Sequence, residues 1–196
     1  MSSELEAELR SHVTAGDLDR ATARAVSVYG PELLGFLRAI AKSDDLADDA
    51  FAMASEQLWT SLAKFRWEAQ LRTWFYQLGR NALHQLRNDP RRRSDRNLPL
   101  SVITSINEVR REPTPMHQRT SGKQALRELR ESLDPDDHEL LILRLDRDMS
   151  WKDIARTFGA EDTAIESRAA ALRKRFERVK EQLRELAIER GLLPEA

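Results

Sequence analysis

Apolar residues recur at three- and four-residue steps through long stretches of this sequence, and this periodicity restricts the chain to helices. The stretches 21–41, 43–62, 69–87 and 162–190 each follow it. Only 7 Gly and 7 Pro occur among 196 residues, and 33% of the residues are charged. Such a composition is typical of helical proteins. The sequence therefore predicts an all-α fold.

Charge is distributed unevenly along the first half of the chain. Residues 1–63 carry five basic and eleven acidic residues, a net charge of −6, whereas residues 64–96 carry nine basic and three acidic residues, a net charge of +6. The formal net charge of −1 for the whole chain hides this separation. One region is therefore suited to a basic partner, and the next to a polyanion.

The segment 65–81 gathers aromatic rings among arginines. On a helix that starts near Ala69, a buried stripe is formed by Leu71, Trp74, Phe75, Leu78 and Ala82. A second face, expected to be exposed, carries Arg72, Tyr76, Arg80 and Arg87. Cations and flat rings suit phosphates and unstacked bases. On this chemistry alone, a well-packed helix with a solvated basic face is an equal alternative.

An acidic patch is predicted on the helix before this segment. Ser43 is placed to cap that helix, and its first turn begins with Asp44 and Asp45. Asp48 and Asp49 follow one turn later, away from the stripe of core positions Ala47, Phe51, Ala54, Leu58 and Leu62. Such a patch favours a partner that neutralises it, although a solvated face that compensates the helix dipole is the alternative.

The residues 44–48 also spell DDxxD, a motif that holds magnesium ions in prenyl-chain synthases. A magnesium-dependent diphosphate enzyme is therefore an alternative of another class. It normally needs a second, opposed aspartate motif, and residues 136–139 (DDHE) make a poor one. The four histidines are dispersed, and the chain has no cysteine. We therefore predict no metal site, no cofactor and no enzymatic activity.

The second half of the chain predicts a linker and a further helical domain. Residues 94–121 are rich in Ser, Pro, Thr and Asn and lack sustained periodicity, apart from an apolar patch at 100–106, so a flexible linker is expected. It would join an N-terminal helical domain, 1–93, to a C-terminal domain, 122–196. In the second domain, Asp134-Pro135 opens a helix whose core is assigned to Leu140, Leu141, Leu143 and Leu145.

A helix-turn-helix pattern follows. Ser150 is placed to cap a short helix, Gly159 to close it, and a long last helix starts near Asp162 and runs to about residue 190. The start of that last helix would face a major groove with Thr163, Ala164, Glu166, Ser167 and Arg168, and its continuation would follow the DNA backbone with Arg173, Lys174 and Arg175. A plain helical hairpin is the alternative.

Together these segments resemble a bacterial alternative sigma factor of the extracytoplasmic-function (ECF) group. The fragments that carry the resemblance are Tyr29-Gly30-Pro31-Glu32-Leu33-Leu34-Gly35-Phe36-Leu37, Asp44-Asp45-Leu46 with Phe51, Phe65-Arg66 with Glu68, Arg72-Thr73-Trp74, Arg80-Asn81, Ser150-Trp151-Lys152-Asp153-Ile154-Ala155, Gly159 and Ile165-Glu166-Ser167-Arg168. Trp67 departs from the family, which usually has glycine there. Glu166 stands where a lysine is common, and Asp48-Asp49 where the family usually has Gln-Glu.

The resemblance implies a role for each segment. Core RNA polymerase would be bound by Asp44, Asp45, Asp48 and Asp49. The melted minus-ten promoter DNA would be held by Phe65, Arg66, Trp67, Glu68, Arg72, Tyr76, Arg80, Asn81 and Arg87. The arginine cluster Arg91, Arg92 and Arg93 is assigned to phosphates, because no aromatic residue accompanies it. The second domain would read the minus-thirty-five element as duplex DNA.

Partners and location follow from the same resemblance. The expected partners are core RNA polymerase and promoter DNA, with an anti-sigma factor as a further candidate. No apolar run approaches the length of a membrane span, and the acidic start at 1–10 does not look like a signal peptide, so we expect a cytoplasmic protein without membrane insertion. The main alternative is a helix-turn-helix transcriptional regulator whose N-terminal domain binds a protein or an effector.

Overall fold

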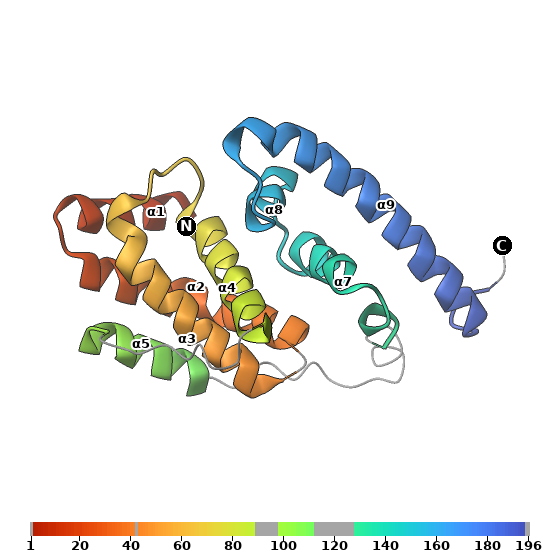
Figure 1. Ribbon diagram of the computed structural model, residues 1–196, viewed down its shortest axis with the longest axis horizontal. Coiled ribbons are helices and arrows are strands. Elements are labelled where there is room, and N and C mark those ends of the chain that lie inside the picture. Colours follow the sequence, from red (N-terminus) through yellow and green to blue (C-terminus); the bar gives the residue numbers. More distant parts are fainter. Residues whose placement is uncertain (1, 42, 89–97, 112–127, 195–196) are drawn as a thin grey trace. The chain divides into compact units, whose positions relative to one another are not determined.

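The computed structural model describes residues 2–41, 43–88, 98–111 and 128–194, and every regular element within these ranges is helical (Figure 1). The elements are α1 (Ser2–Thr14), α2 (Leu18–Ala41), α3 (Asp44–Ser61), η1 (Leu62–Lys64), α4 (Leu71–Asn88), α5 (Leu100–Arg111), α7 (Pro135–Leu141), η2 (Ile142–Asp146), α8 (Trp151–Thr157), η3 (Asp162–Ala164) and α9 (Ile165–Glu189). The chain divides into two compact units, Met1–Thr114 and Pro115–Ala196. The predicted all-α fold is confirmed.

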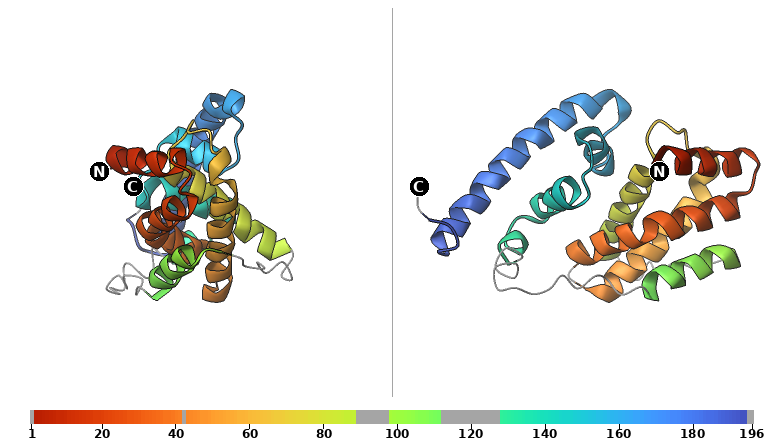
Figure 2. Two further views of the ribbon diagram at one scale, coloured as in Figure 1. Left: turned by 90° about the vertical axis from the view of Figure 1, so that its left-hand side faces the viewer. Right: turned by 180° about the vertical axis from the view of Figure 1, so that it is seen from behind.

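Helix α2 forms the centre of the first unit. It contacts α1, α3, α4 and α5, and the two views of Figure 2 show these helices gathered around it. Because neighbours cover several sides, α2 buries twelve of its residues, among them Val26, Leu33, Phe36 and Leu37. This is wider than the single stripe of an amphipathic surface helix.

Two glycines allow the helices of this unit to approach closely. A Cβ atom on Gly30 would lie 3.0 Å from both Phe51 Cζ of α3 and Val109 Cγ2 of α5. A Cβ on Gly79 of α4 would lie 2.8 Å from Leu33 Cδ1 of α2. Pro31 lies inside α2, which continues past it.

The helix ends follow ordinary capping chemistry, which was predicted for Ser43, Ser150 and Gly159. Asp17 Oδ1 accepts a hydrogen bond from the Arg20 amide at the start of α2, and Ser43 Oγ accepts one from the Leu46 amide at the start of α3. Asp134 caps α7 ahead of Pro135. Ser150 Oγ accepts from the Asp153 amide in α8, and Gly159, at a φ of 80°, ends that helix.

The predicted linker over 94–121 needs correction for residues 100–111. These form α5, which packs on α2 and α3 and buries Val102, Ile106 and Val109. The apolar patch at 100–106 was therefore the first half of an amphipathic helix. The first compact unit ends at Thr114 and the second begins at Pro115. The predicted N-terminal domain ended earlier, at residue 93.

The second unit is built on α9. Helices α7 and α8 both contact it, and Leu172, Phe176 and Val179 are its buried positions there. Leu145, predicted to lie in the core, is 52% exposed because it falls in the π-helical segment η2, where the α-helical spacing no longer holds. The other three predicted leucines of this region are buried.

Helix α9 ends in a Schellman motif. Gly191 has a φ of 67°, its amide donates to Ile188 O, and the Leu192 amide donates to Ala187 O. Among the residues described, no helix has both the length and the apolar character that crossing a membrane requires.

Candidate functional site

An aromatic cluster lies at the segment between η1 and α4. Phe65 stacks on Trp74 with ring centroids 4.5 Å apart and planes 9° apart, and Trp67 lies against Phe65 with centroids 5.0 Å apart. The Arg10 guanidinium of α1 is 5.8 Å from the Trp67 ring. All three rings are half-buried, so each keeps part of its surface open to a ligand. Trp74, predicted to be part of the buried stripe, belongs instead to this cluster.

Trp67 has an unusual backbone conformation. Its φ is 59°, in the left-handed region where a side chain costs about 1–2 kcal/mol and glycine costs little. This gives a physical reason for the glycine that the resemblance to ECF sigma factors leads one to expect at this position. In this chain the surrounding contacts must hold a tryptophan in a conformation suited to glycine.

Helix α4 begins at a carboxylate from α1. The Leu71 amide lies 3.0 Å from both carboxylate oxygens of Glu6, and the Tyr29 hydroxyl donates to Glu6 Oε1 at 3.0 Å. Burial, followed by the Glu6 carboxylate, raises the pKa of Tyr29 well above its ordinary value. The tyrosine therefore stays neutral and remains a hydrogen-bond donor.

The structure corrects the predicted position of Tyr76. Its side chain is fully buried, with its ring centroid 5.3 Å from that of Phe36 in α2, so it does not lie on an exposed DNA-facing surface. The adjacent Phe75 is buried as well and faces Phe51 of α3 at 6.2 Å. Two consecutive rings are buried because α4 packs against both α2 and α3.

Arg72 forms an ion pair with Glu32 inside the first unit. Its Nε lies 3.1 Å from Glu32 Oε2, its Nη2 pairs with Glu32 Oε1, and its guanidinium lies 5.5 Å from the Tyr76 ring. The Arg72 side chain is 21% exposed. This fork-like pairing orients the guanidinium between α2 and α4, so its charge is already balanced by an internal partner.

The remaining predicted minus-ten residues differ in accessibility. Arg66 is 77% exposed along its side chain and pairs with Glu68 at 2.6 Å, and Asn81 is exposed. Arg80 is half-buried. Arg87 donates to the Ile40 carbonyl at the end of α2. Arg91, Arg92 and Arg93 lie outside the described residues.

The acidic patch is only partly a free surface. Asp44 and Asp45 are exposed at the start of α3. Asp48, by contrast, is 18% exposed and lies between two arginines: Oδ1 is 3.1 Å from Arg38 Nη2 of α2, and Oδ2 is 2.9 Å from Arg110 Nε of α5. Asp48 therefore joins three helices, and the prediction of one continuous exposed face is corrected at this residue. Asp49 is half-buried.

The predicted recognition surface of the second unit is exposed. Thr163 and Ala164 lie in η3, and Glu166, Ser167 and Arg168 lie in the first turn of α9. Glu166 Oε1 is 2.5 Å from Lys152 Nζ of α8, with both side chains more than half exposed. The unusual glutamate at this position is thus neutralised by a lysine of the preceding helix.

The three basic residues further along α9 do not share one role. Lys174 is exposed. Arg173 is also exposed, with its guanidinium 5.7 Å from the Trp151 ring. Arg175 pairs with Asp134 at 3.2 Å, with Asp136 at 3.6 Å and with Asp137. It therefore fastens α9 to the start of α7, which corrects its predicted position along a DNA backbone.

One carboxylate of the DDxxD sequence is part of the helix packing. Within the described ranges, no three His, Cys, Asp or Glu side chains are grouped so that they could hold a metal ion. Asp48 of the DDxxD sequence is engaged by arginines.

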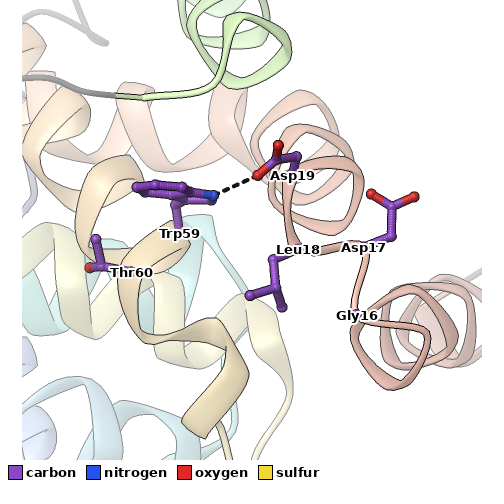
Figure 3. Close-up of a pocket in the computed structure, with 6 residues that line it drawn as sticks. All are labelled: Gly16, Asp17, Leu18, Asp19, Trp59 and Thr60. Carbon is purple, nitrogen blue, oxygen red and sulfur yellow. Dashed lines mark hydrogen bonds between the residues drawn. The ribbon is translucent and has the colours of Figure 1, made fainter.

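A shallow, open pocket lies between the start of α2 and the end of α3, where Trp59 Nε1 donates to Asp19 Oδ1 at 2.8 Å (Figure 3). This hydrogen bond joins the two helices beside the pocket.

The sequence interpretation missed the long-range partners of the site. Glu6 and Arg10 of α1 reach the segment 67–71, Glu32 holds Arg72, and Arg110 holds Asp48. Local periodicity assigns a residue to a helix face but not to a partner helix. Glu6 and Arg10 are four residues apart, which puts them on one face of α1. This spacing was the only sequence pattern that could have indicated a shared contact surface.

One segment of the chain matches a known protein family, and it contains both the acidic start of α3 and the aromatic cluster before α4. Residues 25–93 match the family described as Sigma-70 region 2. No curated protein matches the chain. The co-crystal structure of the sigma factor RpoE in complex with the anti-sigma factor NepR from Bartonella quintana shares the fold with a TM-score of 0.51, at 21% identity, over 81% of this chain and 95% of that chain.

An all-α fold of two helical units, the first built around a Sigma-70 region 2 domain, fits the class of proteins that start transcription at promoters. Residues 25–93 are therefore a Sigma-70 region 2 domain, and the chain shares its fold with the sigma factor RpoE.

Proposed function

We propose that the first unit captures melted minus-ten promoter DNA on the cluster formed by Phe65, Trp67 and Trp74. The observation that carries this proposal is the set of three half-buried rings beside the exposed Arg66, on a segment within the Sigma-70 region 2 match. A base that leaves the duplex gains about 1–3 kcal/mol by stacking on an aromatic side chain. The arginine cluster at 91–93 would add phosphate contacts, which depend on salt but not on sequence.

Polymerase binding is proposed for the exposed start of α3. Arg38 Nε lies 4.0 Å from Asp44 Oδ1, farther than the 3.1 Å between Arg38 and Asp48. Asp44 and Asp45 are both exposed. Exposed carboxylates at a helix start suit a basic surface of the polymerase. Asp48 then supports this surface by joining α3 to α2 and α5.

In the second unit, η3 and the first turn of α9 would read the minus-thirty-five element. The supporting features are the exposed side chains of Thr163, Ser167 and Arg168, together with the short turn that joins α8 to α9. Glu166, paired with Lys152, would be kept from repelling phosphates and could accept from a cytosine amino group.

We propose that the whole chain acts as an RNA polymerase sigma factor of the ECF type, and its remaining partners follow from this role. The polymerase would supply the chemistry of RNA synthesis, and the protein would act in the cytoplasm. An anti-sigma factor is proposed as a regulatory partner, by analogy with the RpoE complex that shares this fold.

Mixing the protein with core polymerase and promoter fragments tests the proposal. A sigma factor should give run-off transcripts and should bind promoter DNA strongly only with core polymerase. Binding of duplex promoter DNA at equal affinity without polymerase would favour an independent helix-turn-helix regulator.

A charge reversal tests the polymerase surface. Asp45→Lys should weaken core binding and lower the unfolding free energy by only about 1 kcal/mol, the effect of a charge in the first turn of a helix. Glu108→Lys, also exposed but on α5, makes the same charge change and should leave core affinity intact. Equal core affinity of the two variants would contradict this assignment.

A further inference from the structure

We infer that α1 holds the DNA-reading segment in its active shape, with Glu6 as the positioning residue. Helix α1 lies outside the Sigma-70 region 2 match, which begins at residue 25. The inference rests on the proposed function in one respect only, that the segment 65–70 reads promoter DNA.

The first step is the contact between Glu6 and the start of α4. Both Glu6 carboxylate oxygens lie 3.0 Å from the amide nitrogen of Leu71, the first residue of α4. The first amides of a helix have no partner within the helix, and the helix dipole is positive there, so a carboxylate stabilises this end. Glu6 therefore determines where the loop ends and the helix begins.

The second step is the fixed orientation of Glu6 itself. The Tyr29 hydroxyl of α2 donates to Glu6 Oε1 at 3.0 Å, and Tyr29 is 6% exposed. One carboxylate thus joins α1, α2 and α4. Leu9, on the same helix, is fully buried and anchors α1 to the unit.

The third step is the contact of α1 with the other end of the same short segment. Arg10 lies one helical turn after Glu6 and is therefore on the same face of α1. Its guanidinium is 5.8 Å from the Trp67 ring. Helix α1 thus contacts both Trp67 and Leu71, the two sides of the turn that leads into α4.

These contacts explain how Trp67 keeps a φ of 59°. A tryptophan in this region relaxes unless its neighbours hold it, and here one neighbour contacts its ring while another fixes the helix that follows. Without Glu6, we expect the segment 67–70 to sample other conformations and to lose its fit to an unstacked base. Polymerase binding through α3 should not depend on this contact.

The test compares Glu6→Ala with Glu6→Gln and with the control Glu8→Ala, each in the full-length protein with core polymerase. Glu8 lies on the same helix, but its partner is Arg24 of α2 at 3.1 Å. Open-complex formation is measured on duplex promoter DNA and on the same promoter with a pre-melted bubble. Exchange of the Leu71 amide hydrogen and iodide quenching of tryptophan fluorescence are measured on the free protein.

Glu6→Ala should slow open-complex formation on duplex DNA by roughly two- to thirtyfold, the range that corresponds to loss of a helix N-cap. Core affinity should be unchanged, and the bubble should restore most of the activity. Glu6→Gln, which keeps an acceptor oxygen, should lie between Glu6→Ala and the wild type, and Glu8→Ala should match the wild type. The Leu71 amide should exchange faster and tryptophan should be quenched more in Glu6→Ala.

Equal activity of Glu6→Ala and wild type on duplex DNA would overturn the inference, as would equal losses on duplex and bubble templates. Failure of the wild type itself to form open complexes would instead refute the proposed function. In that case the Leu71 exchange and the fluorescence quenching still decide whether Glu6 positions this segment. Unchanged exchange and quenching in Glu6→Ala would reject that positioning.

Discussion

At the scale of single residues, Trp67 combines a strained backbone with a ring that we assign to base capture. Trp67→Gly removes the ring and relaxes the backbone, whereas Trp67→Ala removes the ring and keeps a side chain at a φ of 59°. We expect Trp67→Gly to be more stable than Trp67→Ala by about 1 kcal/mol, measured by urea unfolding.

The same two variants separate stability from DNA melting. Both should leave closed-complex affinity nearly unchanged and impair opening of duplex DNA, because both lack the ring, and a pre-melted bubble should restore much of the activity of each. If activity followed stability, with Trp67→Gly opening DNA as well as the wild type, the ring would have no role in melting.

Tyr29 gives the first unit a dependence on alkaline pH. Burial first, and Glu6 second, raise the pKa of Tyr29 in the folded protein. A group with a raised folded pKa contributes its full stability below the unfolded pKa, about 10 for tyrosine, and this contribution is lost as the pH rises toward the folded value. The difference in unfolding free energy between wild type and Tyr29→Phe should therefore shrink between pH 8 and pH 11.

Chemical unfolding of both proteins at a series of pH values measures this difference. Other titrating groups are common to both proteins and cancel in the comparison, including the second tyrosine, Tyr76. A constant difference up to pH 11 would show that Tyr29 ionises equally in the folded and unfolded chains.

At the scale of elements, α4 shows which features periodicity can predict and which it cannot. Of the predicted stripe, Leu71, Phe75 and Ala82 are buried as expected, whereas Leu78 is only half-buried. The periodicity places Tyr76 on the opposite face, which would be exposed to solvent if α4 had only one buried face. Helix α4 packs against both α3 and α2, and Phe36 of α2 covers Tyr76. The number of neighbours a helix has is a tertiary property that its own spacing does not encode.

Helix α5 shows how Asp48 was misplaced. Asp48 lies between Arg38 and Arg110, and Arg110 belongs to a segment that was predicted to be a linker. Asp48→Asn and Arg110→Gln, alone and combined, should give a coupling energy within about 0.5–3 kcal/mol, the range for residues in one network. The exposed pair Glu177–Lys180, treated in the same way, should give no more than about 0.5 kcal/mol.

Urea unfolding of the four combinations at each pair measures both couplings. The network also predicts that Asp48→Lys destabilises the first unit more than Asp45→Lys does, because it brings a third cation to two arginines. Equal unfolding free energies of Asp48→Lys and Asp45→Lys would contradict the structural role of Asp48.

At the scale of the whole molecule, the sequence was sufficient to predict an all-α fold, the caps at Ser43 and Ser150, and the sigma-factor family. These features depend on local chemistry or on several motifs that occur in a fixed order. The extent of the first unit was not predicted, because α5 has only 12 residues and lies between an Arg-rich segment and a segment that contains Pro and Thr. Its place in the fold depends on contacts with α2, and in particular on the room that Gly30 leaves for Val109.

This difference in boundaries leads to a comparison of two fragments. The fragment 1–114 contains α5, whereas the fragment 1–93 ends before it. Removing α5 exposes the surface of α2 that it covers and deletes Val102, Ile106 and Val109, each worth about 1.5–3 kcal/mol when fully buried, before the entropy of ordering the helix is subtracted. We expect 1–114 to unfold cooperatively at a clearly higher temperature than 1–93, as measured by circular dichroism.

A third fragment shows that α5, rather than chain length, is responsible. The fragment 1–114 with Val109→Asp keeps the length but introduces a carboxylate at the contact with Gly30 and should melt close to 1–93, because a buried charge without a partner is strongly destabilising. Glu108→Ala, at the exposed neighbouring position, should melt close to the unmodified 1–114. If 1–93 and 1–114 melt at the same temperature, α5 adds no stability to the first unit, and the domain boundary belongs near residue 93.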